Sequence, residues 1–178
     1  PDPPFMVSRK NGGGIRSSIG SIDANGVKVA NATVPGTDGN ISQLDVENAL
    51  RFDNKLVVFD TTPRGLLNIL NYGAGLPPGN GGYPQIGGVK FSFDPDNPAG
   101  SKVVNVALIN DKGEMIAKVV ENGVILAGAP AVISVVALNF TANGGDGYPI
   151  KSMVDTGGNY LATNFRFLLN DGTLSAAV

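Results

Sequence analysis

Histidine and cysteine are both absent from this chain of 178 residues. Their absence excludes zinc sites built on thiolates, cysteine nucleophiles and every catalytic triad that uses histidine. It also removes the side chain that most often serves as a general base near neutral pH. A metal site made only of carboxylates, or a pair of acids, stays open in principle. The run Asp94–Pro98 contains two aspartates, but its two prolines and the lack of a following glutamate do not fit a calcium loop. We therefore assign no metal ligand to this chain.

Charge is scarce as well. Charged residues make up 16% of the chain and the net charge is −2, which provides no electrostatic basis for binding nucleic acid or an anionic membrane. No run of apolar residues is long enough for a transmembrane helix. Hydrophobic residues, in contrast, account for 42%, and there are 25 glycines and 12 prolines. This composition predicts one folded domain over residues 1–178, rich in turns and short strands, that buries roughly 70% of its unfolded surface. The opening run Pro1–Pro4 suggests a fragment of a larger protein.

Hydrophobic periodicity predicts strands and helices in an irregular order, which indicates the α+β class with mixed β-sheets and a few helices. A hairpin or long loop is expected over residues 17–41 and a surface loop over 73–85. Helices are expected at 42–50, 62–73, with Gly73 as the C-cap, and 159–170. Strands are expected at 5–8, 55–60, 88–93, 102–109, 115–120 and 131–138.

The stretch Asn139–Tyr148 follows the most apolar predicted strand, residues 131–138, which we expect to be buried on both faces. It places one carboxylate, Asp146, among three glycines, with Phe140 and Tyr148 beside it; the glycines are Gly144, Gly145 and Gly147. Glycine lets a ligand approach the backbone closely. An aromatic ring, a carboxylate and bare backbone after a rigid strand favour a polar, ring-shaped ligand. The alternative is a tight glycine turn with ordinary flanking aromatics.

A second glycine run lies near the start of the chain, between Asn11 and Arg16; it consists of Gly12, Gly13 and Gly14. Successive glycines allow a nest of backbone N–H groups that suits an anion, and Arg16 adds a planar set of donors matched to phosphate or carboxylate. The alternative is a flexible hinge beside a solvated arginine.

Taken together, four landmarks resemble the C-terminal domain of the 5′-nucleotidase and UDP-sugar hydrolase family. They are the runs Asn11–Arg16 (NGGGIR), Arg51–Asn54, Gly87–Val89 and Asn139–Gly147, and their order and spacing match over nearly the whole chain. The resemblance implies a substrate-binding domain of α+β fold. It also implies an N-terminal metallophosphoesterase domain, part of the same polypeptide but absent here, that holds two divalent metal ions and performs the hydrolysis.

Site residues follow from the resemblance position by position. Phe52 and Phe140 would sandwich the base, and Asp146 would accept hydrogen bonds from the ribose hydroxyls. Arg16 would face the phosphate, with Asn11 as a polar contact to the substrate. Stacking on an aromatic ring contributes about 1–3 kcal/mol per base and tolerates any base. Arg51 stands where the family more often has proline before the first aromatic.

The resulting expectation is the substrate-recognition domain of a periplasmic or extracellular nucleotidase-like phosphohydrolase, with a nucleotide or another phosphoester as substrate. The chain alone is expected to be inactive. One alternative is a domain that forms one wall of the cleft in a broad-specificity extracellular alkaline phosphatase or phosphodiesterase. Another is a non-catalytic surface or adhesive domain that retains the fold.

Overall fold

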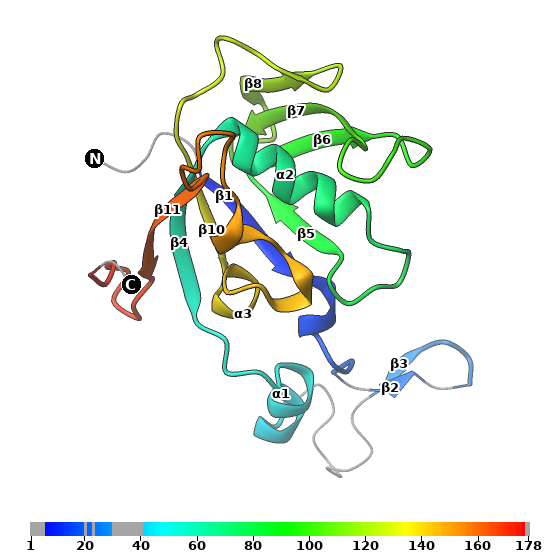
Figure 1. The fold of residues 1–178 in the computed structure, drawn as a ribbon. Coiled ribbons are helices and arrows are strands. Elements are labelled where there is room, and N and C mark those ends of the chain that lie inside the picture. Colours follow the sequence, from blue (N-terminus) through cyan, green and yellow to red (C-terminus); the bar gives the residue numbers. More distant parts are fainter. Residues whose placement is uncertain (1–5, 20, 23, 30–40, 177–178) are drawn as a thin grey trace. The chain divides into compact units, whose positions relative to one another are not determined.

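The computed structural model describes residues 6–19, 21–22, 24–29 and 41–176 (Figure 1). The chain divides into two compact units, a larger one of residues 1–12 and 54–178 and a smaller one of residues 13–53. The larger unit contains a mixed sheet, an antiparallel sheet and a few helices, and the described part of the smaller unit contains an antiparallel strand pair and an α-helix, so the predicted α+β class is confirmed. The prediction that residues 1–178 form one domain stays a prediction.

A five-stranded sheet forms the base of the larger unit, in the order β11-β4-β10-β1-β5. Its strands are β1 (Met6–Asn11), β4 (Leu56–Thr61), β5 (Pro84–Gly87), β10 (Ile133–Leu138) and β11 (Ala162–Phe167). Strand β10 lies in the middle, parallel to β1 and antiparallel to β4. Val135 is 2% exposed on one face of β10 and Ser134 is 1% exposed on the other. The expectation of a strand buried on both faces is therefore confirmed.

Helix α2 (Pro63–Ala74) packs against strands of both sheets of the larger unit (Figure 1). It begins as predicted, because the hydroxyl of Thr62 accepts a hydrogen bond from the backbone N–H of Gly65 and Pro63 occupies the first turn. The C-cap is Gly75 and not the predicted Gly73. Gly73 lies inside the helix, where a Cβ atom would come within 2.8 Å of the Tyr148 hydroxyl, so a glycine is needed there for packing. The helix buries an apolar face made of Leu66, Leu67, Ile69 and Leu70.

A second sheet is an antiparallel meander of four strands: β6 (Val89–Phe93), β7 (Val103–Ile109), β8 (Met115–Glu121) and β9 (Val124–Ile125). The hairpin predicted from the two runs around 102–109 and 115–120 is confirmed by the pairing of β7 with β8. The segment predicted as a surface loop, residues 73–85, ends where strand β5 begins at Pro84, and this strand pairs with β1. Gly88, at φ 74, joins β5 to β6 in a conformation that favours glycine.

The predicted helix over residues 159–170 is wrong. This segment contains β11, which pairs antiparallel with β4. The register shifts between Thr163 and Arg166, and Asn164 adopts φ 55 within that irregularity. A bulge adds a residue to the strand and so breaks the two-residue alternation that would have identified it. The side chain of Phe165 stacks on Phe59 of the core, with ring centroids 5.0 Å apart.

The smaller unit contains helix α1 (Gln43–Ala49) and two short paired strands, β2 (Ser21–Ile22) and β3 (Lys28–Val29). The predicted helix start is confirmed, since Ser42 and Asp45 form a reciprocal capping box. The β2–β3 pair confirms a hairpin in the described part of residues 17–41, while residues 30–40 lie outside the described residues, as does Phe5 of the first predicted strand.

Candidate functional site

Two predicted site residues from opposite ends of the sequence meet in the larger unit. Asn11 is the last residue of β1, and Asp146 lies in the glycine loop after β10. The Nδ2 atom of Asn11 donates a hydrogen bond of 2.8 Å to Oδ2 of Asp146. Strands β1 and β10 are parallel neighbours, so their carboxyl ends reach the same edge of the sheet and bring the two segments together.

The loop holds Asp146 in a left-handed conformation with φ 55, uncommon for a residue other than glycine. The backbone of Asp146 is anchored to α2, because the Tyr72 hydroxyl donates a 2.7 Å hydrogen bond to the Asp146 carbonyl. Gly147 follows at φ 78, and a Cβ atom there would collide with the Tyr72 hydroxyl. Glycine at position 147 therefore lets Tyr72 reach the backbone and present the exposed carboxylate.

Phe140 lies on the short helix α3 (Asn139–Ala142) that precedes this loop. A Cβ atom at Gly145 would lie 2.6 Å from three carbons of the Phe140 ring, so the ring packs directly over the Gly145 backbone. Even so, Phe140 is 45% exposed. A ring supported on one side and open to solvent on the rest is a suitable platform for stacking.

Beneath the loop lies a buried cluster that the sequence analysis did not assign to a site. Arg9 of β1 is 4% exposed, and its Cζ atom lies 3.5 Å from the centre of the Tyr148 ring. The carbonyl of Gly82 accepts hydrogen bonds of 3.0 Å from Nη2 of Arg9 and from the Tyr148 hydroxyl. Tyr72 packs edge-on against Tyr148 with centroids 4.7 Å apart. Tyr148 is only 1% exposed, so it supports the loop and is not the ligand-facing aromatic that its place beside Asp146 suggested.

Burial changes the proton affinity of both members of this stacked pair. It lowers the pKa of the Arg9 guanidinium, while the neighbouring Tyr148 and Asp146 partly oppose that change. Burial also raises the pKa of the Tyr148 phenol, and the cation of Arg9 acts in the opposite direction. Every second residue of β1 is buried, so Arg9 lies on the same side of the strand as Val7 and Asn11. That alternation is the one sequence signal that places the arginine inside the protein.

The smaller unit brings two other predicted residues together. Phe52 is 52% exposed, and the guanidinium carbon of Arg16 lies 5.8 Å from its ring centre. Nη1 of Arg16 donates a 3.2 Å hydrogen bond to the carbonyl of Gly13. The glycine run Gly12–Gly14 forms one turn of 3₁₀ helix, and the N–H of Gly12 donates to the carbonyl of Tyr83. The Gly12 amide is therefore occupied, and the anion-binding nest stays a prediction for Gly13 and Gly14.

Phe52 and Phe140 belong to different units. Each ring is exposed within its own unit. The base sandwich between them stays a prediction.

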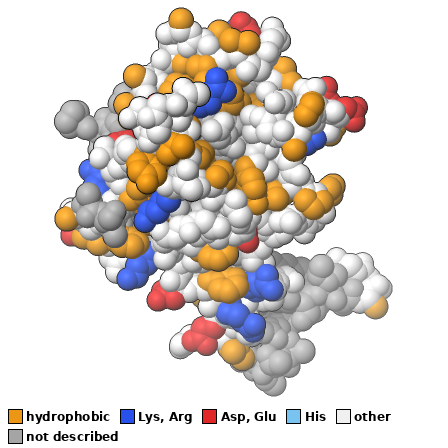
Figure 2. Space-filling view, in the orientation of Figure 1, with side chains coloured by type: hydrophobic (Ala, Val, Ile, Leu, Met, Phe, Trp, Pro, Cys, Tyr) orange, Lys and Arg blue, Asp and Glu red, His pale blue; other side chains and the backbone are white. Residues whose placement is uncertain are grey.

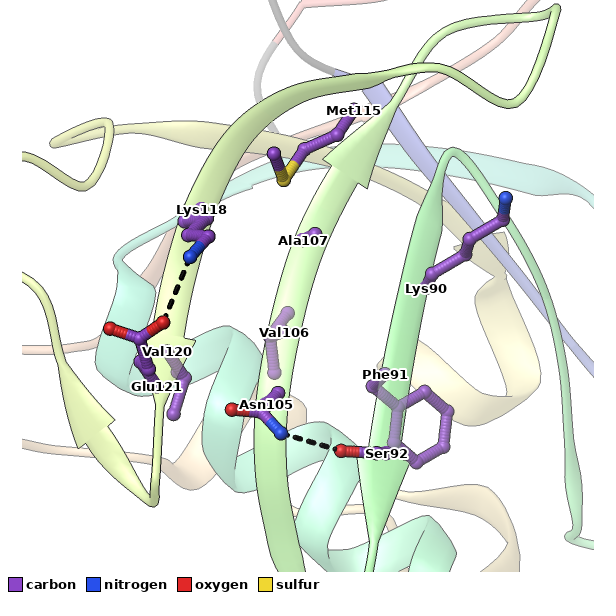
Figure 3. Close-up of a pocket in the computed structure, with 10 residues that line it drawn as sticks. All are labelled: Lys90, Phe91, Ser92, Asn105, Val106, Ala107, Met115, Lys118, Val120 and Glu121. Carbon is purple, nitrogen blue, oxygen red and sulfur yellow. Dashed lines mark hydrogen bonds and ion pairs between the residues drawn. The ribbon is translucent and has the colours of Figure 1, made fainter.

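A hollow of about 430 Å³ lies elsewhere, on β6, β7 and β8 (Figure 3). Its polar side chains already have partners: Lys118 pairs with Glu121 at 2.8 Å, Asn105 donates to Ser92 at 2.9 Å, and Lys90 donates to the Gly113 carbonyl at 3.0 Å. None of the predicted site residues lines it. We therefore place the candidate site at the Asn11–Asp146 pair and not at this hollow. The lining residues are Lys90, Phe91, Ser92, Asn105, Val106, Ala107, Met115, Lys118, Val120 and Glu121.

Within the described ranges, no three acidic residues come together in a way that could hold a metal ion. In the same part of the chain, no helix is both long and apolar enough to cross a bilayer. On the face shown in Figure 2, lysine and arginine side chains are scattered among polar and hydrophobic ones.

Comparison with known proteins agrees with this fold. Residues 6–152 match the family model of the 5′-nucleotidase C-terminal domain. The chain is 28% identical over 145 residues to the trifunctional nucleotide phosphoesterase YfkN of Bacillus subtilis, covering 81% of the chain and 8% of that protein. It is 30% identical over 159 residues to UshA of Escherichia coli, covering 87% of the chain and 21% of that protein.

Among solved structures, the 5′-nucleotidase precursor of Thermus thermophilus aligns with a TM-score of 0.58 and 33% identity, over 86% of this chain and 26% of that one. The chain thus spans between 8% and 26% of the length of the three proteins named here. Since one family model covers most of the sequence, the chain belongs to the 5′-nucleotidase C-terminal domain family.

Proposed function

We propose that this chain is the nucleotide-recognition domain of a metal-dependent phosphohydrolase. The names of its relatives, a 5′-nucleotidase precursor and a nucleotide phosphoesterase, support this substrate class. Hydrolysis, and the two divalent metal ions that it requires, belong to an N-terminal metallophosphoesterase domain of the same polypeptide. In this proposal the parent protein acts in the periplasm or outside the cell. The chain itself binds the substrate and presents its phosphate to that metal site.

The proposed roles divide between the two units. In the larger unit Phe140 stacks on one face of the base, and the carboxylate of Asp146 accepts hydrogen bonds from the ribose hydroxyls. In the smaller unit Phe52 stacks on the other face, and Arg16 faces the phosphate. The observation that carries the proposal is the hydrogen bond from Asn11 to Asp146, in the loop whose glycine Gly145 supports the exposed Phe140 ring. Because Asn11 bonds only one oxygen of this carboxylate, the other oxygen can accept hydrogen bonds from the two ribose hydroxyls.

The test is a titration of adenosine, 2′-deoxyadenosine and ribose into the chain, followed by the amide shifts in NMR spectra. Two stacking faces and one charged acceptor supply about 4–5 kcal/mol after association costs, which corresponds to a dissociation constant near the millimolar range. The variant Phe140→Ala should weaken binding of both nucleosides alike. Asp146→Asn should reduce the preference for adenosine over its deoxy analogue.

Tyr160→Ala is the matched control, because Tyr160 is an exposed aromatic residue outside the proposed site. Binding should be unchanged in this variant. Absence of shifts around residues 52 and 140 in the wild-type chain at tens of millimolar ligand would overturn the proposal. It would favour the cleft-wall or surface-domain alternatives instead.

A further inference from the structure

Arg9 is a cation buried inside the larger unit with part of its hydrogen-bonding capacity unused. It is 4% exposed, and of its three guanidinium nitrogens only Nη2 has a partner among the described residues, the Gly82 carbonyl. Nε and Nη1 are buried and reach no acceptor in the same part of the chain. The Tyr148 ring stabilises the charge across its face, and the Tyr148 hydroxyl, which donates to the Gly82 carbonyl, also offsets part of the cost of burying the cation. Buried donors of a charged group are costly without an acceptor, so these two nitrogens call for one.

The complementary group lies two residues further along the strand. Asn11 is 7% exposed, and its Nδ2 is bonded to Asp146, but its Oδ1 is buried and has no donor among the described residues. Residues i and i+2 of a strand project from the same face, with Cβ atoms about 7 Å apart. Unused donors of Arg9 and the unused acceptor of Asn11 therefore share one buried face of β1. A single water molecule can accept from the guanidinium and donate to Oδ1.

We infer that Arg9 is a positioning residue for Asp146, linked through one internal water molecule to Oδ1 of Asn11. This link orients the Asn11 amide, with its oxygen toward the cation and its NH₂ group toward the carboxylate. The reversed amide would place its oxygen against the Asp146 carboxylate and lose both interactions. With Oδ2 of Asp146 held by Asn11, the exposed Oδ1 keeps a defined position in which to accept from a ligand.

Electrostatics support the same chain of contacts. The carboxylate of Asp146 is among the groups that offset the desolvation of Arg9, so its negative charge acts on the buried cation. Between them lies the Asn11 amide, a dipole whose two ends match the two charges. Arg9 thus affects how the ligand's hydroxyls are recognised without touching the ligand.

This inference rests on the proposed ribose-binding role of Asp146, and its test separates the two. Adenosine, 2′-deoxyadenosine and 2′,3′-dideoxyadenosine are titrated into wild type, Arg9→Met and Arg9→Lys, with NMR confirming that each variant is folded. One charge-assisted hydrogen bond should make wild type favour adenosine over the dideoxy compound about tenfold. Arg9→Met should reduce this ratio at least about threefold and leave binding of the dideoxy compound unchanged. Arg9→Lys, which keeps the charge, should restore part of the ratio.

Arg166→Met serves as the matched control. Arg166 is a partly buried arginine of β11, and β4 and β10 separate that strand from β1. The preference of Arg166→Met for adenosine over 2′,3′-dideoxyadenosine should equal that of wild type. If wild type does not discriminate among the three nucleosides, both the ribose role and this inference are overturned. If wild type discriminates and Arg9→Met discriminates equally, or binds all three equally weakly, the inference alone is overturned.

A second measurement does not depend on any variant. An atomic-resolution crystal structure of the wild-type chain should show a water within hydrogen-bond distance of Arg9 and of Asn11 Oδ1. In NMR spectra of wild type, the two side-chain amide protons of Asn11 should be protected from solvent exchange. A structure without this water, or with the Asn11 amide reversed, would overturn the inference even if Arg9→Met fails to fold.

Discussion

The side-chain amide of Asn11 donates a hydrogen bond of 2.8 Å to the carboxylate of Asp146, across 135 positions of the sequence. Two glycine-rich motifs, each weak alone, are joined by this bond at one edge of a sheet. The bond is made by a buried donor and an exposed acceptor. Asn11 therefore fixes the carboxylate without closing it to a ligand.

Replacing Asn11 should loosen the glycine loop. In Asn11→Ala the carboxylate loses its protein donor but can be hydrated, so we expect a loss of about 1 kcal/mol in the free energy of unfolding. Urea unfolding of the chain measures it. Asn143→Ala, an exposed asparagine of the same loop whose side chain bonds no other described residue, should stay within about 0.5 kcal/mol of wild type. Equal losses in the two variants would contradict a specific role for the Asn11–Asp146 bond.

Gly145→Ala tests the support of the Phe140 ring. The added methyl group would lie 2.6 Å from three ring carbons, so the ring or the loop has to move. We expect a loss of about 1–3 kcal/mol in unfolding free energy, together with large NMR shifts at Phe140.

The matched control is Gly128→Ala, where an added Cβ meets no atom within 4 Å and φ is not positive. It should be neutral or slightly stabilising. Phe140→Ala should remove most of the cost of Gly145→Ala in the double variant. If the two losses simply add, the ring does not rest on Gly145.

Alkaline pH should destabilise the larger unit through Tyr148. Burial raises the pKa of this phenol above its ordinary value of 10.0 in the folded state. As pH rises above about 10, the unfolded chain releases the proton first, so the contribution of Tyr148 is complete below that pH and is lost as pH approaches the raised pKa. The lowered pKa of Arg9 acts in the opposite sense, at pH values just below the ordinary pKa of a guanidinium.

Tyr148→Phe separates the two effects. It keeps the ring over Arg9 but removes the ionisable hydroxyl, so its unfolding free energy should fall less steeply with pH than that of wild type. Urea unfolding at a series of pH values between neutrality and the alkaline limit gives both slopes. Parallel curves for the two proteins would show that Tyr148 does not titrate differently in the folded state.

The isolated chain should hydrolyse no phosphoester with any divalent metal. It has no histidine or cysteine, and its described residues contain no cluster of acids that could hold a metal ion. The measurement is turnover of nucleotides and generic phosphoesters with Mn²⁺, Zn²⁺, Co²⁺ and Ca²⁺, with heat-unfolded chain as background. Metal-dependent turnover above that background would contradict the division of labour in the proposed function.

Local sequence determined the elements whose signals lie within a few residues. The cap and proline at Thr62 and Pro63 specified the start of α2, and the apolar β-branched run before Asn139 specified a buried strand. Backbone conformation at these positions depends on neighbouring residues, so a pattern read along the chain is sufficient. Strand β11 was missed for the opposite reason. Its bulge around Asn164 is stabilised by pairing with β4, and the remaining apolar spacing imitates a helix.

The sequence by itself also determined which residue types and motifs are available for a site, and that no histidine or cysteine chemistry takes place in this chain. Only the tertiary structure decided which of them meet. Asp146 bonds Asn11 because β1 and β10 are parallel neighbours, a pairing between segments more than 120 residues apart. It also decided that Tyr148 and Arg9 are buried, since Tyr72 of α2 packs against the Tyr148 ring and the Gly82 carbonyl bonds both side chains. Contacts between distant segments depend on the whole fold, and no local pattern encodes them.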